Sequence, residues 1–269
     1  MTKFSLIISV YAGENPAFLT ECLESLTTQT VIPDEMIMIK DGPLTDELEK
    51  VIQNLRYQNE VKIISLPKNV TQGPARAEGL KAAQYQWVAV MDSDDVCRPD
   101  RFEKQLGMIE NNNRLNLIGG QIAEFSEDKE KTVATRTVPT NHSEIVGFAK
   151  RRNPFNQMTV MLKRDLAMDA GNYRKFPWFE DYDLWTRMIK KGAVCANHPE
   201  VLVDARVGSG MYGRRRGISY INSEWRMQKQ LKELGFINSA EFIRNAAVRI
   251  PVRLLPEKPL AKLYKKTAR

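Results

Sequence analysis

The chain has 269 residues, 42% of them hydrophobic and 27% charged, with a formal net charge of +7. This length and composition predict a soluble globular protein, built as one large domain or one domain with an extension. No segment approaches eighteen consecutive apolar residues and the N-terminus lacks a signal-peptide pattern, so we expect a cytoplasmic protein with no membrane span. Cys22, Cys97 and Cys195 are far apart and lack CxxC spacing, which excludes a disulfide framework and a structural zinc site.

The positive charge is concentrated at the C-terminus. Residues 244–269 hold eight basic residues and a single acidic residue, Glu257, and this tail accounts for the whole excess. Apolar residues alternate with the basic ones, a pattern compatible either with an anionic membrane surface or with a solvated helix that packs on the domain. No nucleic-acid-binding motif accompanies the charge, so we expect no nucleic-acid partner.

Four apolar runs alternate with helical patterns in the first hundred residues. The runs predict strands at 4–10, 35–40, 61–66 and 87–92, and the periodicity predicts helices around 18–26, 44–58 and 74–84. This alternation is typical of βαβ units, and the nearly continuous apolar strands indicate a parallel sheet covered by helices on both faces. The sequence therefore predicts the α/β class.

The pattern is less regular after residue 99. A helix follows Pro99 through RFEKQLGMIENN, and strands are expected at 115–125 and 132–139. Residues 182–191 form an amphipathic helical pattern with Leu184, Trp185, Met188 and Ile189 on the inner face. Helices dominate from about 217, and Pro251, Pro256 and Pro259 are expected to break up the last segment.

Polar residues suited to chemistry follow three of the predicted strands. They are Tyr11, Glu14, Asp41, Asp92 and Asp94. Ligands of open α/β sheets bind beyond the carboxyl ends of the strands, so we expect these distant positions to converge on one crevice.

The sequence DSDD at 92–95 ends the fourth strand. Asp92 and Asp94 can face the same way and bind a divalent ion that keeps positions for phosphate oxygens, an arrangement suited to the departure of a nucleoside diphosphate. Two alternatives compete with this site. The cluster can be an acidic turn in which Asp95 caps the following helix, or the DxDxV pattern of a haloacid-dehalogenase-type phosphatase with Asp92 as nucleophile.

A second acidic group lies in PWFEDYDLW at 177–185. Its carboxylates and aromatic rings belong to Trp178, Phe179, Glu180, Asp181, Tyr182 and Asp183. Helix capping explains a single carboxylate, whereas aromatic faces beside carboxylates also describe a carbohydrate subsite. A partly desolvated carboxylate there can accept a proton from an attacking sugar hydroxyl.

Taken together, five motifs resemble the family 2 glycosyltransferases, in particular the bacterial members that build capsular, exopolysaccharide or O-antigen repeat units. The motifs are SVYxxExP at 9–16, KDGPL at 40–44, GPARAEG at 73–79, MDSDD at 91–95 and FEDYDLW at 179–185. The resemblance extends from about residue 4 to about residue 207.

The resemblance implies a GT-A fold, with a Rossmann-like, mostly parallel central sheet flanked by helices and a helical C-terminal extension. It implies a catalytic domain over 1–210, divided into a nucleotide-sugar-binding half at about 1–113 and an acceptor-binding half at about 114–210. Residues 211–269 would form the basic extension. The implied reaction is an inverting, metal-dependent single displacement.

The resemblance also implies a role for individual residues. Val10, Tyr11 and Glu14 would line the base pocket, and Asp41 would hydrogen-bond the nucleobase. Arg76 would lie beside the nucleotide, Asp92 would contact the ribose or the metal sphere, Ser93 would belong to the same donor-binding turn, and Asp94 would coordinate Mn²⁺ or Mg²⁺. Asp181 would be the general base, with Glu180 as its neighbour near the acceptor.

Several positions depart from the family pattern or lie outside it. Ala77 replaces an asparagine often seen after the arginine, and Gln157 stands where related sequences often have histidine. Arg214, Arg215 and Arg216 either close over the departing diphosphate or form a solvated turn. Arg151 and Arg152 either meet an acceptor diphosphate or are surface residues, and His142 and His198 are expected to be structural.

The sequence thus predicts a peripheral enzyme on the inner face of the plasma membrane, held there by its basic tail. It would transfer a sugar from a UDP-sugar to a lipid-diphosphate-linked oligosaccharide. Two other functions stay open at this point. One is the phosphatase that uses Asp92, and the other is a non-catalytic scaffold that binds nucleotide sugars.

Overall fold

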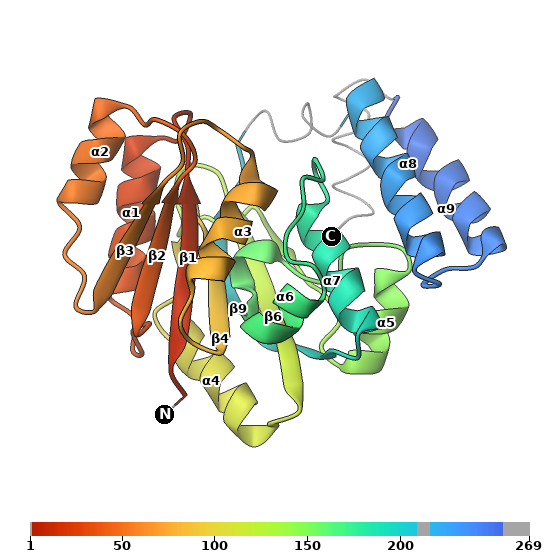
Figure 1. Cartoon of the computed structure of the whole chain (residues 1–269), viewed down its shortest axis with the longest axis horizontal. Coiled ribbons are helices and arrows are strands. Elements are labelled where there is room, and N and C mark those ends of the chain that lie inside the picture. Colours follow the sequence, from red (N-terminus) through yellow and green to blue (C-terminus); the bar gives the residue numbers. More distant parts are fainter. Residues whose placement is uncertain (1, 209–215, 255–269) are drawn as a thin grey trace.

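The computed structural model describes residues 2–208 and 216–254. Within these residues one sheet of nine strands crosses the molecule in the order β3-β2-β1-β4-β8-β6-β9-β5, with β7 paired to β6 (Figure 1). Helices lie against both faces, which confirms the α/β class. No helix in the described ranges is both long enough and apolar enough to cross a bilayer.

The N-terminal half of the sheet is parallel. It consists of β1 (Phe4–Val10), β2 (Glu35–Lys40), β3 (Glu60–Ser65) and β4 (Trp87–Asp92). Strands β1, β2 and β4 are buried along almost their whole length because they carry apolar side chains toward both helical layers. Their carboxyl ends meet at one edge of the sheet.

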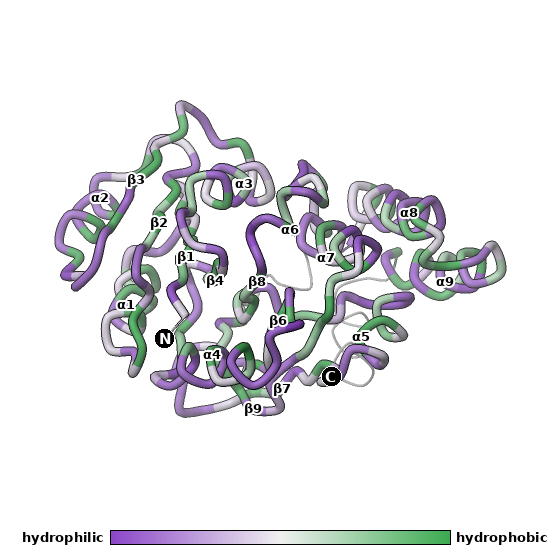
Figure 2. Tube along the Cα trace, turned by 60° about the horizontal axis from the view of Figure 1, so that its bottom comes forward, coloured by the Kyte–Doolittle hydropathy of each residue, from purple (hydrophilic) through white to green (hydrophobic). Residues whose placement is uncertain are grey.

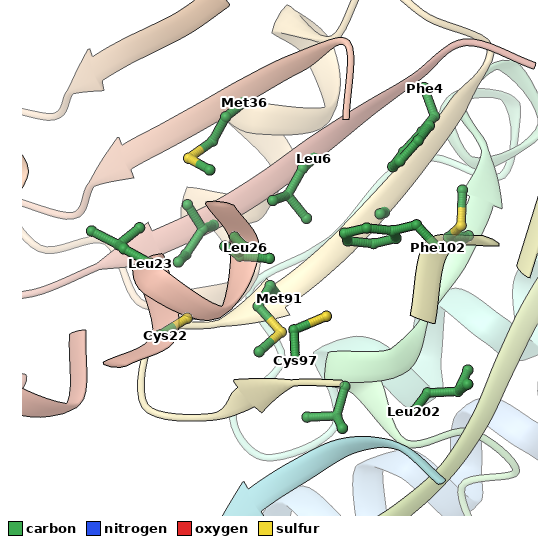
Figure 3. Close-up of a cluster of buried hydrophobic side chains, with 14 of the residues drawn as sticks. Phe4, Leu6, Cys22, Leu23, Leu26, Met36, Met91, Cys97, Phe102 and Leu202 are labelled. Carbon is green, nitrogen blue, oxygen red and sulfur yellow. The ribbon is translucent and has the colours of Figure 1, made fainter. Parts of the chain in front are cut away.

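Two groups of helices cover this sheet. One face carries α1 (Pro16–Thr27), α2 (Asp46–Gln53) and α4 (Arg101–Asn111), which enclose the cluster drawn in Figure 3. The other face carries α3 (Gln72–Ala82), α6 (Arg164–Asp169) and α7 (Glu180–Lys190). The start of α1 is fixed by Pro16 in its first turn and by the Asn15 side chain, which accepts a hydrogen bond from Ala17 N.

The second half of the sheet is mixed. It contains β5 (Val96–Cys97), β6 (Leu115–Phe125), β7 (Ala134–Arg136), β8 (Met161–Lys163) and β9 (Val194–Arg206). Strand β8 runs antiparallel between β4 and β6, whereas β6 and β9 form a long parallel pair. Helix α5 (His142–Ala149) and a short 3₁₀ turn (Gln157–Thr159) complete this half.

Two antiparallel helices follow the sheet. Helices α8 (Ile218–Glu233) and α9 (Ser239–Val252) lie beside α5 and α7, at the opposite end of the molecule from α2 (Figure 1). They pack through a third core cluster, in which Phe179 and Tyr182 contact apolar residues of α8. Asn238 and Glu241 form a capping box at the start of α9.

The predicted strands at 4–10, 35–40, 87–92 and 115–125 have the predicted boundaries. Three expectations need correction. Helix α2 ends at Gln53, and β7 spans only Ala134–Arg136. Pro251 does not break the last helix, because it lies within the final turn of α9, where the helix ends anyway. Pro256 and Pro259 lie outside the described residues.

A buried ionic cluster joins α8 to α9. The Glu224 carboxylate is fully buried and accepts from Arg249 Nε at 2.5 Å and from Arg253 Nη2 at 3.1 Å. Burial alone would raise the pKa of Glu224. The charges and hydrogen bonds of Arg249 and Arg253 outweigh burial and hold this pKa below its ordinary value.

We expect Glu224→Gln to lower the free energy of unfolding by about 3 kcal/mol, because it leaves two guanidinium groups without their buried counter-charge. The folded pKa of Glu224 lies below its unfolded value. The stabilisation is therefore fully present above the unfolded pKa and is lost as pH falls through the folded pKa. Urea denaturation followed by circular dichroism measures both effects.

Glu233→Gln is the matched control, since Glu233 lies on the same helix but is exposed. Its carboxylate forms a surface ion pair with Lys229 Nζ at 3.6 Å. We expect a change of at most about 0.5 kcal/mol for this variant. Equal effects for the two variants, or a Glu224→Gln effect that grows below pH 4, would contradict the assignment.

Candidate active site

The loops after β1 and β2 meet at the carboxyl edge of the sheet. The Val10 side chain is buried in the core, and its carbonyl accepts a hydrogen bond from Asp41 N at 2.7 Å. Tyr11, the next residue, is 44% exposed. The two loops therefore touch through the backbone, while Tyr11 presents its ring to solvent.

Asp41 fixes the loop that precedes α3. Its Oδ1 accepts a hydrogen bond from Val70 N at 2.6 Å, and the carboxylate is almost fully buried. Gly42 follows with a φ of +89°, and a Cβ there would lie 2.6 Å from Asn69 N, so only glycine fits without displacement. One carboxylate oxygen of Asp41 thus takes part in a hydrogen bond within the protein.

The acidic turn after β4 faces the loop after β1. Ser93 Oγ donates to Glu14 Oε2 at 2.5 Å, which places Glu14 beside the turn. Burial, with the charges of Asp92 and Glu14, raises the pKa of Asp94 to about 7. Carboxylates from two distant segments therefore concentrate negative charge at one point.

Asp95 has a structural role that the sequence did not indicate. Its Oδ1 accepts from Arg206 N at 2.7 Å, and the Asp100 side chain forms no cap at the start of α4. The alternative in which Asp95 caps the following helix is therefore not realised. The Arg206 guanidinium lies over the ring of Phe18 at 3.9 Å and donates to Asp94 O, so β9 anchors the acidic turn.

Arg76 joins the two acidic motifs. This buried side chain of α3 donates from Nη2 to Asp92 Oδ1 at 2.6 Å and from Nη1 to Glu180 Oε1 at 3.1 Å. Its Nε is buried and has no hydrogen-bond partner in the described ranges. The guanidinium thus connects the end of β4 with the start of α7.

The start of α7 holds two carboxyl groups in different surroundings. Burial and the charge of Asp181 raise the pKa of Glu180 to about 7, although Arg76 opposes the shift. Burial also raises the pKa of Asp181, which accepts from Asn153 Nδ2 at 2.6 Å and from Tyr182 N at 2.6 Å. Asp183 is fully buried and paired with Arg187 at 2.7 Å, so it stabilises the helix.

Trp178 differs from the other aromatic residues of this motif. Phe179 and Tyr182 are buried, whereas Trp178 is 45% exposed and has a φ of +72°. Its ring lies 5.6 Å from that of Tyr220 on α8. A bulky residue rarely adopts this backbone conformation, and such strain is frequent at ligand sites. The motif therefore presents one aromatic face next to Glu180.

The two departures from the family pattern have local explanations. Ala77 is buried and faces the core. Gln157 Nε2 donates to Tyr173 OH at 3.0 Å, while Gln157 Oε1 is buried without a partner in the described ranges. The side-chain amide of Gln157 thus contacts another buried side chain of the protein.

Both histidines accept backbone hydrogen bonds, in keeping with their predicted structural roles. His142 Nδ1 accepts from Cys195 N, and His198 Nδ1 accepts from Glu200 N, both at 3.2 Å. All three cysteines are buried, and none forms a disulfide. Arg214 and Arg215 lie outside the described residues, whereas Arg216 is exposed.

The described residues contain no group of three or more histidine, cysteine, aspartate or glutamate side chains at metal-binding spacing. The turn instead offers Asp92 and Asp94, with Glu14 near them. Magnesium sites of this kind use one or two carboxylates and complete their shell with phosphate oxygens and water. The residues therefore fit a divalent ion that arrives with a diphosphate.

Three contacts of the site could not be predicted from the sequence motifs. They are the hydrogen bond of Asn153 to Asp181, the anchoring of the turn by Arg206, and the contact of Ser93 with Glu14. Asn153 follows two arginines that the sequence did single out. No local pattern marked Arg206, because its partners lie far away along the chain.

Comparison with known proteins identifies the relatives of this chain. Amylovoran biosynthesis glycosyltransferase AmsE of Erwinia amylovora is 38% identical, covering 98% of both chains. The UDP-Gal:alpha-D-GlcNAc-diphosphoundecaprenol beta-1,3-galactosyltransferase of Escherichia coli is 36% identical, covering 99% of this chain and 97% of its own.

Solved structures share the fold. Staphylococcus aureus TarS in complex with UDP-GlcNAc matches with a TM-score of 0.69 and 17% identity, over 94% of this chain and 72% of that one. The mannosyltransferase PcManGT from Pyrobaculum calidifontis, in complex with GDP-Man and Mn²⁺, matches with a TM-score of 0.64 and 13% identity, over 98% and 81%. These likenesses confirm the GT-A fold.

A family model matches the amino-acid sequence of this chain directly. The model of glycosyl transferase family 2 matches residues 5–174, which contain the acidic turn after β4 and the arginine that bridges it. Of the three functions that the sequence left open, this result selects sugar transfer over the phosphatase and the non-catalytic scaffold. The chain belongs to glycosyltransferase family 2 and is a glycosyltransferase.

Proposed function

We propose that this enzyme transfers a sugar from a UDP-sugar to a lipid-diphosphate-linked saccharide during synthesis of a bacterial surface polysaccharide such as capsule or O-antigen. The observation that carries the proposal is the Arg76 bridge, which holds the acidic turn after β4 and the acidic start of α7 in one site. The names of the two relatives, one an amylovoran enzyme and one acting on a diphosphoundecaprenol acceptor, support the pathway and the acceptor class.

The donor binds on the N-terminal half of the sheet. Tyr11 offers an exposed ring for the base, with Val10 and Glu14 beside it, and Asp41 keeps one carboxylate oxygen for the nucleobase. We assign the donor half to residues 1–113 and the acceptor half to 114–210, with the helical extension after them.

Asp94 would coordinate a divalent ion, Mn²⁺ or Mg²⁺. Asp92 would contact the ribose or the ligand sphere of this ion, and Ser93 lies in the same turn. When bound, the ion would supply positive charge to the departing diphosphate. Arg76 is already paired with Asp92 and Glu180, so its charge is shared between the acidic turn and the start of α7. The Mn²⁺ in the PcManGT structure supports this choice of ion.

The chemistry requires one proton acceptor near the acceptor hydroxyl. As that hydroxyl oxygen forms a bond to the anomeric carbon, the bond from this carbon to the diphosphate breaks, and its electron pair leaves with UDP. The hydroxyl proton moves to Asp181, whose burial raises its pKa and so makes it a stronger base. A single displacement inverts the anomeric centre. Glu180, held by Arg76, orients this end of the site.

We expect Asp181→Asn to lower kcat by about 10² to 10⁴-fold while the affinity for UDP stays within about twofold, because a base acts in the transition state. Radiolabelled sugar transfer and calorimetric UDP titration measure the two quantities. Asp165→Asn, at an exposed carboxylate of α6, is the control and retains transfer. A large loss of UDP affinity in Asp181→Asn would reassign this residue to donor binding.

Asp94→Asn tests the metal assignment. We expect it to reduce the stabilisation that Mn²⁺ and UDP together give to the protein, since the ion loses its anionic ligand. The measurement is the rise in melting temperature with both ligands, compared with UDP alone. Asp128→Asn, at an exposed carboxylate, is the matched control. An undiminished manganese response in Asp94→Asn would place the ion elsewhere.

We also propose that the enzyme is cytoplasmic and lies on the inner face of the plasma membrane. Exposed apolar residues on α9 and in the turn that follows it support this proposal. Ile243, Val248 and Leu254 are each more than 60% exposed, and Arg244 lies among them. Figure 2 shows hydrophobic and hydrophilic residues alternating along α9, at the edge of the molecule far from β3. The sequence after residue 254 contains further basic residues.

The double variant Ile243→Glu/Leu254→Glu tests membrane binding. Each replaced side chain removes about 1.5–3 kcal/mol of apolar burial and adds a negative charge, so partition onto anionic vesicles falls at least tenfold. Co-sedimentation with phosphatidylglycerol vesicles measures it. Val133→Glu, at a residue 50% exposed beside β7, is the control and binds as the wild type does. Unchanged partition of the double variant would remove α9 from the membrane contact.

A further inference from the structure

A groove runs along α5 and the turn that follows it. Its volume is about 660 Å³, within the range of about 300–1,000 Å³ that is usual for small-molecule sites. It is lined by Pro139, Glu144, Gly147, Phe148, Arg151 and Arg152. Apolar and cationic residues therefore share one concave surface outside the donor half.

The lining residues are segregated along the groove. Phe148 and Gly147 belong to the last turn of α5, and Arg151 and Arg152 follow the end of the helix. Glu144 lies near the start of the same helix, about 10 Å from the arginines at 1.5 Å per residue. The groove thus has a cationic end, an apolar middle and one carboxylate at the far end.

We propose that this groove binds the diphosphate of the acceptor and the apolar lipid segment attached to it, with Arg151 and Arg152 on the phosphates. The proposal rests on the proposed function and adds to it the residues that hold the acceptor. Guanidinium groups bind phosphate oxygens in pairs of charge-assisted hydrogen bonds, and the apolar middle suits a hydrocarbon chain. Glu144 repels phosphate and so favours one orientation of the ligand.

The cationic end adjoins the proposed base. Asn153 directly follows the two arginines, and its Nδ2 donates to Asp181 Oδ2 at 2.6 Å. Arg136 on β7 is also close enough for its charge to lower the pKa of Asp181. A diphosphate at Arg151 and Arg152 therefore brings the sugar attached to it toward Asp181.

The turn that carries the arginines is held by its backbone. The carbonyl of Arg151 accepts from Arg249 Nη1 at 2.8 Å, and that of Lys150 accepts from Asn245 Nδ2 at 2.9 Å. The carbonyl of Ala149 accepts from the Tyr182 hydroxyl of α7. Since α7 and α9 fix the main chain while the two arginine side chains are exposed, the site is preorganised for an anion.

The test uses dodecyl diphosphate, an anionic amphiphile that lacks a sugar, at concentrations below micelle formation. Calorimetric titration of the full-length enzyme without divalent ions keeps the metal-dependent donor site from capturing the probe. We expect Arg151→Ala/Arg152→Ala to weaken binding at least about tenfold, through the loss of charge-assisted hydrogen bonds. Arg56→Ala/Arg114→Ala, at two exposed arginines elsewhere, is the control and binds as the wild type does.

A second pair of variants fills space and leaves the charges in place. A Cβ added at Gly147 or at Gly107 meets no atom within 4 Å, so leucine is accommodated at both helical positions. We expect Gly147→Leu to block the groove and weaken binding, whereas Gly107→Leu on α4 leaves it unchanged. Melting temperatures of all four variants verify that they are folded.

Wild-type affinity in Gly147→Leu, or equal affinity for dodecyl trimethylammonium, overturns the proposal. Because the titration involves neither donor nor turnover, its outcome is separate from that of the proposed function. Probe binding in the groove with unimpaired sugar transfer by Asp181→Asn would contradict the proposed mechanism while the anion site stands. A wild-type KM for the acceptor in Gly147→Leu would instead show that the groove does not bind the acceptor, whereas the proposed sugar transfer would stand.

Discussion

The site depends on a single buried guanidinium. Asp92 ends strand β4 and Glu180 begins helix α7, and each would be costly to bury alone. Arg76 lies between them and compensates both charges with direct hydrogen bonds. Through this pairing α3, β4 and α7 meet at the carboxyl edge of the sheet. The relative position of the acidic turn after β4 and the start of α7 therefore depends on one side chain of α3.

The strands could be predicted from the sequence because the physics that forms them is local. A run such as FSLIISV is apolar at five of its seven positions and is buried along almost its whole length, so its ends coincide with the ends of burial. Helix ends are decided differently. Helix α2 ends at Gln53 although the apolar periodicity continues, and α9 includes Pro251 although proline has no N–H to donate to the carbonyl four residues earlier, because the helix ends only one residue later.

The same distinction applies to the site. Asp92, Asp94 and Asp181 were found from short motifs, since each lies beside other acidic residues in the sequence. The surroundings of these groups could not be found in this way. In one alternative Asp95 would cap a nearby helix, but its partner is the backbone of Arg206, which the pairing of β9 with β5 and β6 brings close. Asn153 likewise meets Asp181 through the packing of α5 against α7. The sequence therefore identified the types of residue at the site. The contacts of these residues could be identified only from the three-dimensional structure.

The two C-terminal helices bear on catalysis through the same packing. Glu224 ties α9 to α8, and α9 in turn holds the carbonyls of Lys150 and Arg151, three and two residues before Asn153. Asn153 reaches the carboxylate of Asp181, so a continuous set of contacts runs from the extension to the proposed base. The cluster of buried residues around α1 and α4 contains no residue of α5, α7, α8 or α9. Loosening α9 should therefore impair acceptor use before donor binding, because the helix that presents apolar residues outward is also the one that fixes the acceptor side of the site.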